Sequence, residues 1–184
     1  CQVAFSQGDQ PVIVPMIYGR RGQTLYLHGA RKARVVRMLE ANPKVCVHVT
    51  LLDGIVLARS TFNASMNYRS VSVFGSPELI EDPIEKEAAL RIISEQVMPG
   101  RWDEVRPSSD REVAMTGVLR LPIESASAKI SSGPPDDEGD DLAESVWAGV
   151  LPLVLQAGAL QPDPVLDPKQ LPSDAMLSLE GVIY

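Results

Sequence analysis

The sequence is poor in the residues that build disulfide frameworks and nucleic-acid-binding surfaces. It contains two cysteines, and Asp and Glu outnumber Lys and Arg by 24 to 17, for a formal charge of −7. Two cysteines, with Cys46 inside an apolar run, do not support a disulfide framework. The acidic balance lacks the basic surface that a phosphate backbone requires. We therefore expect a cytoplasmic protein without a nucleic-acid partner.

Long apolar runs are also absent. No uninterrupted run approaches the roughly 20 residues needed to cross a bilayer, so we expect no membrane partner. Hydrophobic residues still make up 45% of the 184-residue chain, which is enough for one core. Because prolines recur after Leu155, we expect a packed domain over residues 1–155 and a proline-rich C-terminal extension over residues 156–184. That extension is expected to pack on the surface or on a partner subunit.

Histidine is scarce as well, which argues against two common kinds of catalytic centre. Zinc sites need three or four protein ligands, and His28, His48 and Cys46 fall short of a complete set, so we expect no metal site. His48 is instead interpreted as a hydrogen-bonded pocket or interface histidine. The serines lack a G-x-S-x-G elbow, and neither histidine has a recognisable acid partner, so a serine-hydrolase triad is not supported.

Short β-prone runs separated by turn residues are present throughout the first half of the chain. The runs Gln2–Phe5, Val12–Tyr18 and Thr24–His28 predict consecutive hairpins. The spacing of apolar residues over Lys32–Asn42 predicts a short helix.

A further hairpin is predicted where Asp53 and Gly54, a pair suited to a type I′ turn, separate the runs Val45–Leu52 and Ile55–Ser60. The later predicted elements are a strand from Tyr68 through Phe74 toward Ile80, an acidic helix over Pro83–Val97, a strand over Val113–Ile123 and a solvated loop over Ser131–Asp141. Many antiparallel strands with few helices favour a mainly β barrel or sandwich over a parallel α/β fold.

One predicted strand leads through a small-residue turn into the basic start of a predicted helix. Gly29 and Ala30 permit close backbone approach, and the unpaired N–H groups at a helix start attract anions. Arg31, Lys32 and Arg34 add positive charge. The pattern is typical of a phosphate site, and its alternative is a solvated basic first turn.

A second polar group lies between two predicted strands, over residues 59–71. Tyr68 and Ser70 fall on one face of a strand, whereas Arg69 and Val71 fall on the other, so they do not all meet one ligand in a regular strand. A dimer interface would let each face serve a different subunit. The alternative is a polar surface loop followed by an ordinary strand.

Four motifs together resemble the nitroimidazole-reductase-related branch of the pyridoxamine 5′-phosphate oxidase superfamily. They are Pro15–Tyr18, Leu25–Gly29, Val47–Gly54 and Ser65–Val71, and their order and spacing match over roughly Cys1 to Trp147. The resemblance implies an antiparallel split β-barrel that binds FMN. It also implies a homodimer with one flavin at each end of the subunit interface.

The resemblance also assigns residues to the flavin. It places His28, Gly29, Lys32 and Arg34 near the ribityl phosphate, in the turn that contains Ala30; Thr50, Ser60, Tyr68, Arg69 and Ser70 along the flavin; and Lys129 and Trp147 where the pocket closes. One departure is Ala33, where similar proteins often present a hydroxyl. Its absence leaves Arg34 and backbone N–H groups to hold the phosphate.

The implied function is that of an FMN-dependent oxidoreductase, which passes electrons from a reduced nicotinamide or another donor to a small-molecule oxidant. One alternative is a non-catalytic flavin-binding module. Another is a split barrel that uses haem or a deazaflavin, with His28 as a conceivable haem ligand, although the basic turn after His28 favours phosphate.

Overall fold

Two antiparallel β-sheets pack against each other in the computed structural model, which describes residues 1–184. The first sheet has six strands: β1 (Gln2–Gln7), β2 (Gln10–Pro15), β5 (Val45–Leu57), β6 (Ser65–Gly75), β9 (Ser125–Ser131) and β10 (Gly149–Pro152). Its order is β2-β1-β5-β6-β9, and β10 pairs with the outer part of β5. The second sheet has the order β3-β4-β8-β7 and contains β3 (Tyr18–Arg21), β4 (Thr24–Ala30), β8 (Thr116–Pro122) and β7 (Glu78–Leu79).

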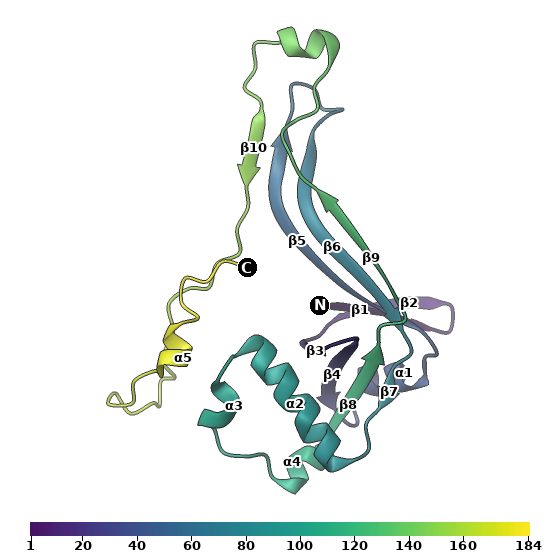
Figure 1. Ribbon diagram of the computed structural model, residues 1–184, viewed down its shortest axis with the longest axis vertical. Helices are drawn as coiled ribbons and strands as arrows, with labels where there is room; N and C mark the ends of the chain where they lie inside the picture. The colour runs from purple at the N-terminus through teal and green to yellow at the C-terminus, as the bar shows by residue number, and fades with distance from the viewer.

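Short helices connect and cover the sheets. They are α1 (Arg34–Ala41), α2 (Pro83–Val97), α3 (Arg101–Glu104), α4 (Asp110–Met115), the 3-10 helix η1 (Gly139–Ala143) and α5 (Asp174–Leu177). Figure 1 shows α2, α3 and α4 at the barrel end of the molecule, while β5, β6 and β9 rise from the barrel as a long arm. No helix is both long enough and apolar enough to span a membrane.

The core lies between the two sheets and is closed by α1. Alternate residues of β4, β5 and β8 point into it, because successive side chains of a strand face opposite sides. Its buried members are Val3, Phe5, Leu25, Leu27, Val36, Leu39, Val45, Val47, Val73, Leu119 and Leu121. The mainly β, antiparallel split barrel predicted from the sequence is therefore confirmed.

Two glycines let α1 approach the second sheet. A Cβ at Gly29 would lie 3.0 Å from Cγ2 of Val36, and one at Gly117 would lie 2.7 Å from Cγ1 of the same side chain. Gly29 therefore serves close packing of α1, in addition to any role near a phosphate.

We expect Gly117→Ala to destabilise the fold by about 1–3 kcal/mol, the usual cost of overpacking a filled core. The new methyl group must displace Val36 and with it the start of α1. The midpoint of urea denaturation measures the effect, and Gly8→Ala is unsuitable as its control because Gly8 has a positive φ. Gly158→Ala is a suitable control, because no atom lies within 4 Å of the new Cβ. It should leave the free energy of unfolding within about 0.5 kcal/mol of wild type.

The predicted hairpin turn at Asp53 and Gly54 is wrong. β5 continues through both residues and pairs with β6 from Val45 opposite Gly75 to Val56 opposite Ser65, with a register shift between Leu52 and Gly54. Asp53 is the extra residue of a bulge, which a strand accommodates by a local bend. The real connection to β6 follows at residues 58–64.

Other boundaries also differ from the prediction. The predicted strand over Val12–Tyr18 is divided between the two sheets, since β2 ends at Pro15 and β3 begins at Tyr18. Residues 113–115 belong to α4, which a capping box between Ser109 and Glu112 begins. The helix over Pro83–Val97 is confirmed, with the Asp82 carboxylate accepting a 2.8 Å hydrogen bond from the N–H of Glu85.

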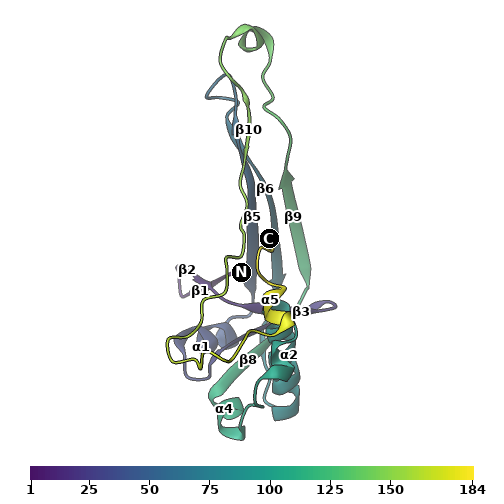
Figure 2. The same cartoon turned by 90° about the vertical axis from the view of Figure 1, so that its left-hand side faces the viewer.

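The last thirty residues form a closed loop. The N–H of Ala157 donates to the carbonyl of Val182, and that of Tyr184 donates to the carbonyl of Leu155, both at 2.9 Å. The loop therefore leaves and returns at the same place, as Figures 1 and 2 show for the green and yellow segments. Within the loop, Ala175 lies against Gly100 at the start of α3.

Candidate functional site

The predicted phosphate site lies at the start of α1. Ala33 is the N-cap residue and its side chain makes no capping hydrogen bond, so the first N–H groups of the helix have no side-chain partner. This agrees with the missing hydroxyl noted in the sequence. An anion placed here would meet both these donors and the positive end of the helix.

The three cationic side chains around this helix start differ in whether they already have hydrogen-bond or ion-pair partners. Arg31 Nη1 lies 3.2 Å from a Glu40 oxygen, and the Arg34 guanidinium donates to the side-chain oxygen of Gln7. Lys32 is exposed and takes part in none of the chain's salt bridges. At the start of α1, Lys32 therefore has no ion-pair partner, and Arg34 is hydrogen-bonded only to a neutral amide.

His28 belongs to the same stretch of chain but faces the other side of the sheet. Leu27 points into the core with Val36 of α1, so His28, one residue on, points away from α1. It lies opposite Val118 of β8, whose side chain packs with Ile80 and Ala89 beneath α2. The structure therefore does not bring the His28 side chain together with the basic turn.

A cavity of about 400 Å³ adjoins His28 between β4 and α4. It is lined by His28, Gly29, Ala30, Glu112, Met115 and Thr116. The Nδ1 atom of His28 is buried and has no hydrogen-bond partner. Burial lowers the pKa of His28 below its usual value, so the ring is neutral at pH 7.

The predicted flavin-lining residues Thr50 and Ser70 lie side by side with Lys129 on one face of the arm. They are register partners across β5, β6 and β9, and directly opposite residues of antiparallel strands share a face. Tyr68 is on the same face, and its ring centre lies 5.7 Å from Nζ of Lys129. We call this surface, together with His48 and Ser72, the polar face of the arm.

His48 occupies the base of the polar face. Its Nδ1 lies 2.9 Å from Ser72 Oγ and its Nε2 lies 2.6 Å from Thr50 Oγ1. Both ring nitrogens are thus occupied, and the prediction of a hydrogen-bonded histidine is confirmed.

Farther from the barrel, the same face of the arm becomes apolar. Ile55 lies opposite Met66 of β6 and opposite Leu151 of β10, and all three side chains are exposed. We define the arm patch as Leu52, Ile55, Leu57, Met66, Leu151 and Trp147. Trp147, predicted to close the flavin pocket, is 71% exposed, and its ring covers Gly149 of β10.

Arg69 projects from the opposite face of the arm, as its alternation with Tyr68 and Ser70 predicts. Its Nη2 lies 2.8 Å from an oxygen of Asp53, and its Nε lies 3.0 Å from the other. The hydrogen bond from Arg69 is the main reason that the pKa of Asp53 lies below its usual value. Arg69, predicted to contact the flavin, is therefore paired with the bulge residue of β5.

We expect Arg69→Gln to raise the pKa of Asp53 back toward that of an ordinary aspartate. The depressed folded-state pKa means that this pair stabilises the fold above the unfolded pKa and ceases to do so as the pH falls through the folded one. A carboxyl-carbon NMR titration of Asp53 measures the change, with Arg106→Gln as a control that leaves it unaltered. An unchanged Asp53 titration in Arg69→Gln would show that Arg69 is not the cause of the lowered pKa of Asp53.

Ser60 lies at the tip of the arm, in the connection between β5 and β6, beyond the polar face. Its hydroxyl accepts a 3.3 Å hydrogen bond from the N–H of Asn63 and so stabilises the turn between β5 and β6. Beside it, Asp137 is only 1% exposed in its side chain and lies 3.1 Å from Nη1 of Arg59. This partly buried ion pair holds the acidic loop after β9 against the arm tip.

The predicted residues therefore form separate groups in one chain. One is the helix start at Lys32 and Arg34, the second is the polar face, and the third is the arm patch with Trp147. Sequence reasoning missed the His28 cavity and the partners of Arg69 and Arg59, namely Asp53 and Asp137. The sequence alone did not indicate the roles of Asp53 and Asp137. Asp53 pairs with Arg69 because it lies in a bulge, and Asp137 lies in a loop that contacts Arg59, 78 residues earlier in the chain.

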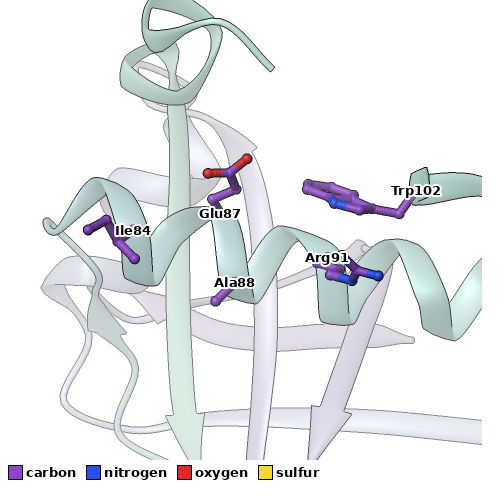
Figure 3. A pocket seen from close by; sticks show the side chains of 5 residues that line it. All are labelled: Ile84, Glu87, Ala88, Arg91 and Trp102. Atoms are coloured by element: carbon purple, nitrogen blue, oxygen red, sulfur yellow. The ribbon is translucent and has the colours of Figure 1, made fainter. Parts of the chain in front are cut away.

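A second hollow, of about 170 Å³, lies on the outer face of α2. Figure 3 shows Trp102 reaching from α3 over this helix, near Arg91 and on the side to which Glu87 points. Arg91 is paired with Asp103 at 2.6 Å. No residue predicted to bind a cofactor lies here.

Comparison with known proteins places the fold in a family. The sequence model of the family described as pyridoxamine 5′-phosphate oxidase matches residues 1–130. No curated protein matches the chain. The flavocytochrome Anf3 from Azotobacter vinelandii is 35% identical, with 98% of this chain and 84% of that chain covered and a TM-score of 0.91.

Two further solved structures are similar. The FAD- and haem-binding protein from Mycobacterium smegmatis is 36% identical, with 98% of this chain and 88% of that one covered and a TM-score of 0.93. A putative 5-nitroimidazole antibiotic resistance protein from Bacteroides thetaiotaomicron is 30% identical, with 69% and 74% covered and a TM-score of 0.58.

These findings define an antiparallel split-barrel protein. The chain belongs to the pyridoxamine 5′-phosphate oxidase family, and the resemblance seen in its sequence motifs is confirmed.

Proposed function

We propose that this protein is a flavin- and haem-binding oxidoreductase that works as a homodimer, with FAD as its flavin. The observation that carries the proposal is the extent of similarity. The two solved structures that match 98% of this chain are a flavocytochrome and a protein named for FAD and haem. The family model ends at residue 130, so only these two relatives, among those compared above, share the extension and β10.

The start of α1 supports a flavin phosphate. Uncapped N–H groups lie there, and Lys32 and Arg34 flank the N-cap residue Ala33 in the chain. Each hydrogen bond from a charged donor to phosphate is worth about 1.5–3 kcal/mol. The sequence resemblance implies FMN, which has one such phosphate. FAD has two, and a protein 36% identical to this one is named for it, so we place FAD first and FMN as the alternative.

The surface of a single chain supports a dimer. The accessible surface is 12358 Å², whereas a folded monomer of this mass exposes about 8,700 Å². The excess greatly exceeds the roughly 800 Å² that each partner buries in a standard interface. We therefore place the arm patch and the extension, residues 156–184, against a second copy.

A dimer also offers a way to assemble the site. The helix start and the polar face are separate within one chain, and an arm that crosses the partner's barrel would bring Thr50, Ser70 and Lys129 of one copy toward the basic turn of the other. In this arrangement Tyr68 supplies an aromatic wall for a flat ring, and Lys129 adds charge beside it. Ser60 and Arg69 serve the architecture of the arm.

A bound flavin would supply two-electron redox chemistry and a bound haem one-electron chemistry. The chain's own residues bind, orient and exclude water: the helix start anchors the phosphate, and the polar face donates hydroxyl hydrogen bonds. The second copy would cover the arm patch and so remove its apolar side chains from water. A reduced nicotinamide or another donor is the expected electron source, and a small molecule is the expected oxidant.

The test is to extract the cofactors from purified protein and to follow reduction anaerobically. Acid-released flavin identified as FAD, together with haem shown by a pyridine haemochrome spectrum, would support the proposal. Reduction of bound flavin by a nicotinamide, followed by reoxidation with an added acceptor, would support turnover. Bound flavin that no donor reduces would instead indicate a non-catalytic flavin-binding module.

A further inference from the structure

Three aliphatic hydroxyls lie on the polar face of the arm, and they differ in where their hydrogens can point. Ser70 donates its hydroxyl hydrogen to the carbonyl of Lys129 at 3.4 Å, so it offers an approaching ligand only its lone pairs. Thr50 and Ser72 instead bond to the two ring nitrogens of His48, at 2.6 and 2.9 Å. The His48 ring therefore decides the direction of both of these hydroxyls.

The two tautomers of His48 have opposite effects on its neighbours. A neutral imidazole has one nitrogen that donates and one that accepts. With the proton on Nε2, the ring donates to Thr50 Oγ1 and accepts from the hydroxyl of Ser72. With the proton on Nδ1, both hydrogen bonds reverse. The first tautomer leaves the hydroxyl hydrogen of Thr50 free, and the second leaves that of Ser72 free.

The burial of the two hydroxyls favours the first tautomer. Ser72 is half-buried in β6, between β5 and β9, whereas Thr50 is exposed. A hydroxyl hydrogen without a partner is costly where water has limited access, but an exposed one can be met by water or by a ligand. The proton of His48 is therefore expected on Nε2, with the hydrogen of Thr50 directed away from the ring.

A free hydrogen on Thr50 matches what a flavin ring requires. The ring nitrogens and carbonyl oxygens of a flavin are mostly acceptors, and hydrogen bonds to them tune its chemistry. Lys129, exposed and in none of the salt bridges, is a donor on the same face. Because the hydrogen of Ser70 is already used, Thr50 is the hydroxyl of this row that can join Lys129 as a donor.

We propose, on the basis of the proposed function, that His48 is a positioning residue for the flavin. It holds the oxygen of Thr50 as an acceptor through Nε2–H and so leaves the Thr50 hydrogen free to donate to the bound ring. His48 acts only through Thr50. The bond between Ser72 and Nδ1 fixes the tautomer from the other side of the imidazole.

The first test is a double-mutant cycle in the full-length protein freed of cofactor, with FAD affinity measured by fluorescence titration. Thr50→Val removes the hydroxyl and should weaken FAD binding by about fivefold to tenfold, the effect of one hydrogen bond. His48→Asn should weaken it equally, because its amide stops at the δ position, beside Ser72. The double variant should bind within about twofold of Thr50→Val, since both changes remove the same interaction.

His48→Gln is the matched control. Its amide reaches the ε position and can still donate to Thr50, so FAD affinity should stay within about threefold of wild type. A merely structural role for His48 predicts equal losses in His48→Asn and His48→Gln, because each removes the ring and one of its two hydrogen bonds. Equal losses, or losses that add in the double variant, would overturn the proposal while the proposed function stood.

A measurement on the wild-type protein keeps the test decisive if a variant fails to fold. Long-range proton–nitrogen NMR at pH 8, above the range in which histidine usually titrates, identifies the protonated ring nitrogen of His48. We expect the proton on Nε2, and a proton on Nδ1 would overturn the proposal. Wild-type protein that binds no flavin at all would instead refute the proposed function itself.

Discussion

A single charge at Ile55 should separate the two subunits. Ile55 lies at the centre of the arm patch, between Met66 and Leu151, and we expect Ile55→Asp to raise the dimer dissociation constant by about 100-fold or more. An unpaired carboxylate buried in an apolar interface costs several kcal/mol. A two-fold interface presents each substitution twice, which enlarges the effect. Sedimentation velocity over a range of concentrations measures it.

The matched control is Ile84→Asp. Ile84 lies on the outer face of α2 and is 80% exposed, so the same substitution there should leave the dimer intact. Because Ile55 is itself partly exposed in one chain, the variant should still fold, and its circular dichroism should match wild type. Equal dissociation of both variants, or of neither, would contradict a dimer built on the arm patch.

Removal of charge from the start of α1 should weaken binding of phosphorylated flavins selectively. Lys32→Ala and Arg34→Ala should each weaken binding of FMN and FAD by about 10–100-fold, because each removes a charge-assisted hydrogen bond of about 1.5–3 kcal/mol. Riboflavin has no phosphate, so its affinity should change by less than about threefold. Fluorescence titration of the cofactor-free protein with all three flavins measures the difference.

Arg37→Ala is the control for this pair. Arg37 is exposed on the same helix, one turn beyond its start, and its loss should leave all three flavins unaffected. If riboflavin affinity fell as much as FMN affinity in Lys32→Ala and Arg34→Ala, the damage would be general, and the phosphate would have to lie elsewhere.

The sequence predicts the architecture better than it predicts the assembly of the site. Alternation in Val45–Leu52 and the capped, acidic helix at Pro83–Val97 are local properties, and both survive in the structure. The Asp53-Gly54 pair shows the limit of local reasoning. The pair favours a turn locally, but β5 instead pairs continuously with β6, and Asp53 forms an ion pair with Arg69, 16 residues away.

The site residues show a second limit. The sequence correctly places Tyr68 and Ser70 opposite Arg69, because strand alternation is a local rule. It cannot show that α1 packs behind Gly29 while His28 faces α4, since that division depends on the pairing of β4 with β8. The hydrogen bonds of the two histidines also depend on tertiary structure, since both ring nitrogens of His48 have partners whereas Nδ1 of His28 has none.

Flavin and haem should occupy one protein, and the absorption spectrum of the purified dimer tests this most directly. Protein loaded with FAD and haem and freed of excess cofactor by gel filtration should show flavin bands and a Soret band in a single peak, near one of each per chain. Chemical reduction should bleach the first and shift the second. A dimer that retains flavin but never haem, or neither cofactor, would contradict the proposed flavin- and haem-binding function.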